Sequence, residues 1–218
     1  MNRGLLGLDL DGVLIPNDSS WDLYHRILGT EEGRKRNMDL FFSGRIDYRT
    51  WAEMDADLWR GMSYRPIERY LEGLTVNEGA IELVSEMREM SVEIAIVSTG
   101  ISSFAERISR ILGIDTVIAN EVETNGGEIT GEVRAECGFD EKGSKLRELG
   151  EGMGIPRSRW SCVGDDENDL SMFRIVPFSI AYNPKSAKLT EIATLTIESE
   201  NLHQVLRSLV RHYNQFDV

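Results

Sequence analysis

The stretch Leu5-Leu6-Gly7-Leu8-Asp9-Leu10-Asp11-Gly12 decides the fold of this chain. It is a short apolar run that stops at two aspartates and a glycine. Continuously apolar runs of this length are typical of strands that are covered on both faces, as in a parallel sheet. If the strand continues to Asp11, Asp9 and Asp11 lie on one face, because side chains alternate along a strand. The stretch therefore predicts a buried strand that ends in paired carboxylates.

Similar apolar runs recur along the chain and alternate with segments of helical spacing. The runs cover residues 92–97, 116–119, 160–163 and 178–181, and the helical segments cover 78–90, 102–112, 141–153, 169–175 and 201–213. Strands that alternate with helices form parallel sheets with helices on both faces. We therefore expect an α/β fold with a doubly wound parallel sheet.

Two insertions interrupt this alternation. Residues 16–74 contain many aromatic side chains and no strand-like run, and they are too many for a loop. We expect them to form a small helical cap domain, inserted after the first strand of a core domain made of residues 1–15 and 75–218. The second insertion, 121–133, carries Asn125-Gly126 between apolar residues, which predicts the two central residues of a β-hairpin turn.

The composition limits the partners of the protein. The chain has 218 residues and a formal net charge of −13, which argues against nucleic acid, because proteins bind that polyanion mainly through Lys and Arg. No apolar stretch is long enough to span a membrane, and the N-terminus lacks a signal-peptide pattern, so we expect a cytoplasmic protein without a membrane partner. Cys137 and Cys162 are too few for a disulfide framework. Exposed cap aromatics would support a homodimer, and core packing would explain them equally well in a monomer.

A second acidic cluster, Gly164-Asp165-Asp166-Glu167-Asn168-Asp169, also follows a predicted strand. Ligands of open α/β sheets bind at the carboxyl ends of the strands, where the strand order reverses. If the two strands are neighbours, the carboxylates of both clusters converge, namely Asp9, Asp11, Asp165 and Asp169. Mg²⁺ is the hard cation that such oxygen ligands favour. The alternative is a simple turn at Asp11-Gly12 and a solvated loop at 165–169.

Two further sites follow the same pattern. Val97-Ser98-Thr99-Gly100 offers hydroxyl groups and backbone N–H groups for an anion, or it is an ordinary helix N-cap. Lys142 lies where a helix is expected to begin, which is unfavourable for a cation beside the positive end of the helix dipole. Lys142 is therefore a candidate phosphate ligand or a solvated surface lysine. Lys145, one turn further on, competes for the same role.

Taken in order, these motifs resemble those of the haloacid dehalogenase superfamily, and the stretch 164–173 and the position of the cap are most similar to its phosphoserine phosphatase-like branch. The resemblance implies that Asp9 is the nucleophile and that Asp11 is the general acid and base. It implies that Mg²⁺ is held by the Asp9 carboxylate, the backbone carbonyl of Asp11 and Asp165, with support from Asn168 and Asp169. The residues implied to bind the phosphoryl group are Ser98, Thr99, Gly100, Lys142 and Asn168.

The function implied is that of a Mg²⁺-dependent phosphomonoester hydrolase, which acts on a small phosphorylated metabolite through an aspartyl-phosphate. A phosphotransferase of the same fold would use the same residues and hand the phosphoryl group to another alcohol. A receiver domain that accepts phosphate on an aspartate without catalysis is a further alternative, as is a non-catalytic binding protein. The helical cap and the second aspartate at plus two argue against a receiver.

The cap departs from the pattern of the branch. When Gly44-Arg45-Ile46-Asp47-Tyr48 is aligned with the cap of the family, the arginine that grips the serine carboxylate falls on Asp55, and the residue that reads the amino group falls near Asp18. Tyr48 and Asp55 share one helical face with other aromatic residues. Asp55 is expected either to pair with an arginine or to face a cavity, and Arg49 or Arg60 would be the substitute for the missing arginine.

An Asp55 that faces the site would repel a substrate carboxylate and accept an amine or a neutral group. Phosphoserine is then one candidate substrate, and the phosphate ester of an amino alcohol is a second. The cap segment therefore makes the substrate a separate question from the chemistry of the core motifs.

Overall fold

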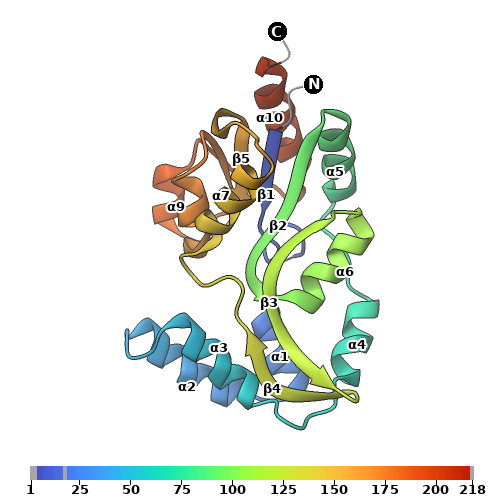
Figure 1. Cartoon of the computed structure of the whole chain (residues 1–218), viewed down its shortest axis with the longest axis vertical. Helices are drawn as coiled ribbons and strands as arrows, with labels where there is room; N and C mark the ends of the chain where they lie inside the picture. Colours follow the sequence, from blue (N-terminus) through green and yellow to red (C-terminus); the bar gives the residue numbers. More distant parts are fainter. Residues whose placement is uncertain (1–3, 17–18, 217–218) are drawn as a thin grey trace.

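The computed structural model describes residues 4–16 and 19–216, which form a seven-stranded sheet with helices on both faces (Figure 1). The strand order is β4-β3-β2-β1-β5-β6-β7. The strands are β1 (Gly4–Leu8), β2 (Val92–Ile101), β3 (Thr116–Asn125), β4 (Glu128–Arg134), β5 (Trp160–Gly164), β6 (Phe178–Tyr182) and β7 (Leu195–Ile197). Neighbouring strands are parallel except for β3 and β4. The predicted doubly wound α/β sheet is confirmed.

Strand β1 is the point at which the strand order reverses. The chain adds β2, β3 and β4 on one side of β1, and then β5, β6 and β7 on the other. Leu8 is in register with Ile96 of β2 and with Val163 of β5, so the three strands end at the same edge. The residues that follow these strand ends therefore meet at one place, where ligands of open α/β sheets bind.

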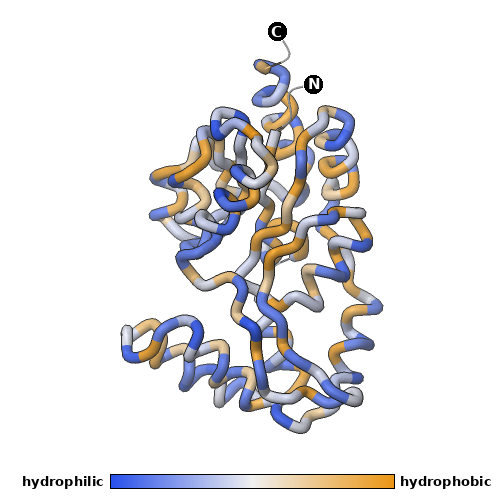
Figure 2. Tube along the Cα trace, viewed as in Figure 1, coloured by the Kyte–Doolittle hydropathy of each residue, from blue (hydrophilic) through white to orange (hydrophobic). Residues whose placement is uncertain are grey.

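Two hydrophobic layers cover the sheet. On one face, α5 (Ala80–Glu89), α6 (Ser102–Leu112) and α10 (His203–Tyr213) pack on side chains such as Leu6, Ile96 and Val163. On the other face, α7 (Lys142–Gly152), α8 (Leu170–Phe173) and α9 (Ala187–Ile192) pack on side chains such as Leu5, Val97 and Cys162. Figure 2 shows hydrophobic residues concentrated along the central strands between these layers. The continuous apolar runs of the sequence are explained by this burial on both faces.

The insertion after β1 is helical, with α1 (Ser20–Leu28), α2 (Glu31–Phe42), α3 (Tyr48–Asp57) and α4 (Arg65–Glu72). In Figure 1, α1, α2 and α3 lie beyond the carboxyl edge of the sheet, while α4 lies beside α6. Its two connections to the sheet are bonded to each other, since Asn77 donates its backbone N–H to Leu14 O and its side-chain N–H to Val13 O, each at 2.8 Å. We propose the division into a cap domain, 16–74, and a core domain, 1–15 and 75–218, on this arrangement.

The β3–β4 hairpin extends from the sheet toward this insertion. Its turn has Gly126 and Gly127 at the two central positions, with φ of 60° and 85°, while Asn125 is the last residue of β3. The expectation that Asn125 and Gly126 are the central pair is therefore wrong by one residue. Two glycines adopt positive φ without the strain that a Cβ brings, so they form the turn.

The turn end of the hairpin is hydrogen-bonded to residues 61–64 of the insertion. Gly61 donates its backbone N–H to Ile129 O, Ile129 donates to Met62 O, and Tyr64 donates to Gly127 O, each at 2.8 Å. Arg60 also donates to Thr130 O at 2.5 Å. The hairpin, expected as an excursion of the core, thus joins the core to the helical insertion. Across the described residues, no helix is both long and apolar enough to span a membrane.

Candidate active site

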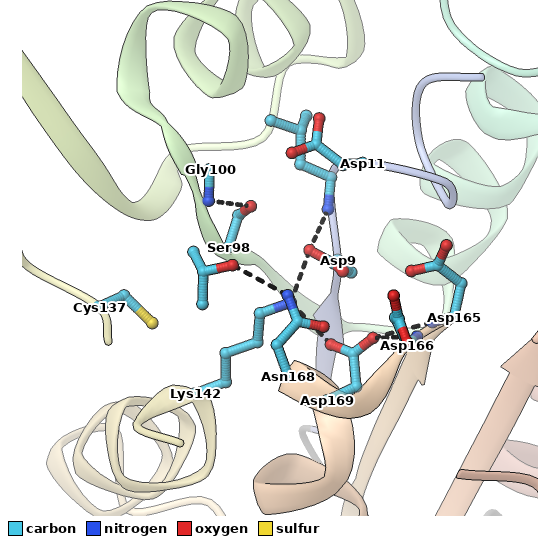
Figure 3. A network of polar contacts seen from close by, with 12 residues as sticks. Asp9, Asp11, Ser98, Gly100, Cys137, Lys142, Asp165, Asp166, Asn168 and Asp169 are labelled. Carbon is cyan, nitrogen blue, oxygen red and sulfur yellow. Dashed lines mark hydrogen bonds and ion pairs between the residues drawn. The ribbon is translucent and has the colours of Figure 1, made fainter. Parts of the chain in front are cut away.

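Asp9 lies buried directly after β1, where it shares a lysine with Asp169 (Figure 3). Lys142 Nζ lies 2.8 Å from Asp9 Oδ1 and 2.7 Å from Asp169 Oδ1, and the Leu10 N–H donates to Asp9 Oδ1 at 2.7 Å. Burial raises the pKa of Asp9 above its usual value, as do the charges of Asp169 and Asp165, while Lys142 opposes them. A buried carboxylate in this setting is stabilised by the cation beside it.

Lys142 is fully buried at the first residue of α7, and its ammonium group is committed to the two aspartates. Burial lowers the pKa of Lys142, but the charges of Asp169 and Asp9 outweigh it and hold this pKa above its usual value. Lys145 is only partly buried. Of the two lysines that the sequence left open, Lys142 is therefore the one in the cluster, and it is not a solvated surface lysine.

Asp165 follows β5 and brings a second lysine to the cluster. Lys185 Nζ lies 2.7 Å from Asp165 Oδ2, and the backbone N–H of Lys185 donates to Asp165 O at 2.8 Å. Asp169 Oδ2 accepts the Asp165 N–H at 2.8 Å, which fixes the two carboxylates relative to each other. Burial and the charge of Asp169 raise the pKa of Asp165 to about 7, against the opposing charge of Lys185.

Gly12 makes room for this carboxylate. Its φ of 80° lies in the left-handed region, and a Cβ on Gly12 would collide with the Asp165 carboxyl group. A glycine is thus required here both by the backbone and by the close approach. The turn predicted at Asp11-Gly12 is therefore present, and the glycine in it also makes room for the Asp165 carboxyl group.

Asp9, Asp165 and Asp169 offer ligand atoms that all lie within 4.8 Å of one another, and all three residues are buried. Three buried carboxylates repel one another unless cations offset the charge, and oxygen donors at this spacing suit a hard divalent ion. The Oδ1 atom of Asn168 is also buried, and nothing among the described residues donates to it. The donor set therefore fits Mg²⁺. The Asp11 carboxylate is not in this group, so the sequence-based expectation that all four aspartates converge on one point is wrong for its side chain; the resemblance assigns the backbone carbonyl of Asp11 to the metal.

Asp11 points away from the cluster toward the start of α1. Its Oδ2 accepts from the Ser20 N–H at 3.1 Å and from Ser20 Oγ at 3.0 Å. Burial raises the pKa of Asp11 to about 6, although the hydrogen bonds from Ser20 oppose this shift. Within the described part of the chain, Asp11 Oδ1 is buried and accepts no hydrogen bond. Strand β1 ends at Leu8, so the expected continuation to Asp11, with both carboxylates on one face, is wrong.

Ser98, Thr99 and Gly100 lie at the end of β2, beside Asp11. Strand β2 continues to Ile101, so these residues are in a strand and not in a helix N-cap, which corrects one of the two alternatives. The Gly100 N–H donates to Ser98 Oγ at 2.9 Å. A Cβ on Gly100 would collide with Ser20 Oγ and lie 2.7 Å from Asp11 Oδ2. The absent side chain lets Asp11 and Ser98 approach the same space.

The carbonyl oxygen of Thr99 accepts three hydrogen bonds from three different elements. They come from Trp21 Nε1 of α1 at 2.9 Å, from Tyr48 OH of α3 at 2.6 Å and from Asn120 Nδ2 of β3 at 2.8 Å. Burial raises the pKa of Tyr48, so its hydroxyl remains protonated and donates. Thr99 Oγ1 accepts from Asn168 Nδ2 at 2.9 Å. The helical insertion is thus bonded directly to the end of β2.

A cavity of about 340 Å³ lies between the helical insertion and this edge of the sheet. At one end it reaches Thr99, Asp166, Asn168 and Lys185. At the other end lie six residues of α1, α2 and α3, which we call the cap wall: Trp21, Asp22, Arg34, Tyr48, Trp51 and Asp55. We call Asp9, Lys142, Asp165 and Asp169 the floor, which contacts the near end through Lys185.

Asp55 both lines the cavity and is paired, but its partners are not arginines. Its Oδ1 accepts from Asn37 Nδ2 at 2.7 Å, and its Oδ2 lies 3.2 Å from His25 Nε2. The proposed substitutes point elsewhere. Arg49 is exposed beside Glu53, and Arg60 binds Asp57 and the hairpin. The expected pairing of Asp55 with an arginine is therefore wrong, while its expected position on a cavity is right.

Comparison with known proteins gives the family. The family described as haloacid dehalogenase-like hydrolase matches residues 6–174. The chain belongs to the haloacid dehalogenase-like hydrolase family. The phosphoserine phosphatase of Methanocaldococcus jannaschii is 28% identical over 206 residues, which cover 94% of this chain and 97% of that protein. The phosphoserine phosphatase of Albidiferax ferrireducens is 30% identical over 213 residues, or 93% of this chain and 87% of that protein.

Solved structures agree with this assignment. A phospho-aspartyl intermediate analogue of phosphoserine phosphatase superposes with a TM-score of 0.83 at 28% identity, covering 95% of this chain and 99% of the other. A substrate-bound phosphoserine phosphatase complex gives the same TM-score and coverage at 27% identity. The predicted family and its phosphoserine phosphatase-like branch are confirmed. The roles of single residues in this hydrolase remain predictions, and Asp18 lies outside the described residues.

Sequence reasoning missed several residues of this hydrolase site. Lys185 lies three residues after β6, at the same sheet edge as the predicted clusters, and this position was a usable signal. Asn120 is buried, and besides Thr99 O it binds Cys137 in both directions, donating to Cys137 O at 3.0 Å and accepting the Cys137 N–H at 2.9 Å. No local motif marks Asn120. Burial raises the pKa of the Cys137 thiol to about 12, so Cys137 acts here through its backbone.

Proposed function

We propose that this chain is a Mg²⁺-dependent phosphomonoester hydrolase that acts on a small phosphorylated metabolite through an aspartyl-phosphate on Asp9. The arrangement around Asp9 carries the proposal. Both the Leu10 N–H and Lys142 fall on Asp9 Oδ1, which leaves Oδ2 as the oxygen that attacks phosphorus. The carboxylate is held in one orientation by these two contacts, as a nucleophile requires.

The reaction divides into two displacements. In the first, Asp9 Oδ2 forms a bond to phosphorus, the bond to the leaving oxygen breaks, and Asp11 donates a proton to that oxygen. In the second, Asp11 takes a proton from water, which attacks phosphorus and releases inorganic phosphate and Asp9. A pKa of about 6 suits Asp11 to both roles, because it exchanges protons near neutral pH.

The phosphoryl oxygens would be bound by groups already positioned in the site. Lys142 supplies a buried positive charge, and Ser98 accepts from Gly100 and keeps its own hydroxyl hydrogen for the phosphoryl group. Mg²⁺, held by Asp9, Asp165 and Asp169 with support from Asn168, would neutralise the phosphate charge when bound. The relatives are named phosphoserine phosphatases, so phosphoserine is one candidate substrate, and an amino alcohol phosphate is the second.

The test is phosphate release from a panel of phosphomonoesters, with Mg²⁺ and after its removal by a chelator. We expect turnover with Mg²⁺ and a loss of at least about a thousandfold in Asp9→Asn, because the amide is a poor nucleophile. Asp115→Asn, at an exposed aspartate before β3, is the matched control and should keep full activity. Acid quenching followed by peptide mass spectrometry should find the phosphoryl group on Asp9.

Phosphate release from Asp9→Asn at the rate of the unmodified protein would contradict the covalent route. Turnover that survives complete removal of divalent ions would contradict the role of Mg²⁺. A phosphorylated Asp9 that persists without hydrolysis would favour the receiver alternative.

A further inference from the structure

The cap wall contains the carboxylate of Asp55, whose neighbours are Asn37 and His25 rather than a lysine or an arginine. Asp55 is almost fully buried, at 1% exposure, and its oxygens are held by Asn37 and His25. The Asn37 amide is uncharged.

His25 lies between Thr30 and Asp55. Trp59 Nε1 donates to Thr30 Oγ1 at 2.9 Å, and His25 Nδ1 lies 2.7 Å from the same oxygen. His25 Nε2 lies 3.2 Å from Asp55 Oδ2. The described lining of the cavity has three acidic residues and two basic ones, so it favours a cationic ligand over an anionic one; the acidic residues are Asp22, Asp55 and Asp166, and the basic ones are Arg34 and Lys185.

The cations at the cavity are already committed to other carboxylates. Arg34 forms an ion pair with Asp22, and Lys185 forms one with Asp165. Among the described residues that line the cavity, these are the two with cationic side chains. A substrate carboxylate would have to displace Asp22 from Arg34 and would still meet the charge of Asp55, which makes a carboxylate unfavourable here.

Aromatic rings surround the same end of the cavity. Trp21, Tyr48 and Trp51 belong to the cap wall, and Phe42 and Phe139 also line the cavity. Trp51 lies edge to face with Tyr48, with ring centroids 5.9 Å apart, and Phe42 is also edge to face with Trp51, at 5.9 Å. Aromatic faces attract cations, and the attraction grows in a site that excludes water.

We propose that the cap wall binds the ammonium group of the substrate, and that the preferred substrates are aminoalkyl phosphates without a carboxylate. The inference rests on the proposed function, because the phosphoryl end is assigned to the floor. Hydrolysis then releases an amino alcohol and inorganic phosphate. Asp55 supplies the charge that selects the amine, and the rings supply the apolar walls around its methylene groups.

Three esters of matched size test this inference: O-phosphoethanolamine, ethyl phosphate, which lacks the amine, and O-phospho-L-serine, which adds a carboxylate. We expect kcat/KM for phosphoethanolamine to exceed both others by at least about tenfold. A fourth ester, p-nitrophenyl phosphate, has neither an amine nor a carboxylate, so its hydrolysis reports the chemistry of the floor without recognition of an ammonium group by the cap wall. The comparison uses the unmodified protein, so it holds whether or not any variant folds.

The variant Asp55→Asn removes the charge and keeps the size of the side chain. Its preference for phosphoethanolamine over ethyl phosphate should fall to about twofold or less. Asp57→Asn is the matched control, since Asp57 ends the same helix, is exposed and pairs with Arg60. It should retain the preference. Circular dichroism of both variants confirms that they are folded.

The outcomes separate the two proposals. Phosphoserine turned over as fast as phosphoethanolamine, or equal rates for all three esters, would overturn the inference and leave the proposed function intact. Turnover of p-nitrophenyl phosphate, with none of the three other esters hydrolysed, would also overturn the inference and leave the proposed function intact. A folded Asp55→Asn that keeps the full preference would overturn the role of Asp55. Failure on all four esters with Mg²⁺ would overturn the proposed function itself, and the inference with it.

Discussion

The aspartates of the floor and Asp55 of the cap wall are all buried, but their carboxylates have different neighbours. In the floor, Asp9 and Asp169 share Lys142, and Asp165 binds Lys185, so each carboxylate has a cation. In the cap wall, Asp55 accepts a hydrogen bond from the uncharged amide of Asn37, and its Oδ2 lies 3.2 Å from His25 Nε2. The floor therefore pairs its carboxylates with lysines, whereas the cap wall surrounds its buried carboxylate with an amide and an imidazole.

The largest effect that sharpens this contrast is expected at Lys142. Lys142→Met keeps the length of the side chain and leaves Asp9 and Asp169 buried without their cation. Removal of one partner from a buried ion pair typically costs about 3–5 kcal/mol of unfolding free energy. Urea denaturation measures this loss, and phosphate release should fall at the same time.

Lys145→Ala is the control for this substitution. Lys145 is partly exposed on the same helix and should change the unfolding free energy by less than about 0.5 kcal/mol. If both lysine substitutions lowered the unfolding free energy equally, the ion pairs of Lys142 would contribute no more to stability than a lysine on the surface of the same helix.

A smaller effect is expected at Asn120, which joins the floor side to the cap wall. Asn120→Asp replaces the amide group that donates hydrogen bonds to Thr99 O and Cys137 O. A carboxylate oxygen would then face these two carbonyl oxygens without a hydrogen between them. We expect a loss of at least about 2 kcal/mol of unfolding free energy, from the loss of buried hydrogen bonds. Asn125→Asp, exposed at the end of the same strand, should be neutral. If the Asn120→Asp variant kept its stability and its kcat, the hydrogen bonds of Asn120 would not be what connects the floor side to the cap wall.

The smallest effect is expected at Arg49. Its guanidinium lies 3.6 Å from Glu53 on the exposed face of α3, with 71% of the side chain accessible. Exposed pairs of this kind contribute little to stability. Arg49→Ala should leave KM for every ester within about twofold, as measured by steady-state kinetics. A clear rise in KM for a carboxylated ester alone would move carboxylate recognition to Arg49 and contradict the account of the cap wall.

The sequence predicted the floor better than the wall for a physical reason. Asp9 and Asp165 follow buried strands directly, and Ser98 lies in the last part of β2. Parallel strands bring their carboxyl ends to one edge, so residues near the ends of these strands lie close together in space. The same rule applied to β6 would have found Lys185. The order of the apolar runs was likewise enough to predict the sheet, apart from the short β7, whose residues are mostly exposed.

The wall could not be predicted in this way. Asp55 contacts His25 and Asn37 only because α3 packs beside α1 and α2. The spacing of residues within one helix does not predict which other helices it packs against. Aromatic residues at helical spacing identified the face of α3 that lines the cavity, but not the partners of its carboxylate. Asn120 was missed because its partners, Thr99 and Cys137, are backbone groups from distant segments.

The hydrogen bonds between the β3–β4 hairpin and residues 61–64 restrict how the cavity can open. The two connections to the insertion are hydrogen-bonded to each other at Asn77. The hairpin attaches the insertion at a second place, through residues 61–64. Strand β3 of the hairpin also carries Asn120, which donates to Thr99 O. The insertion is therefore tied to the sheet at two separate places, and a movement that opened the cavity would have to bend the hairpin or break its hydrogen bonds.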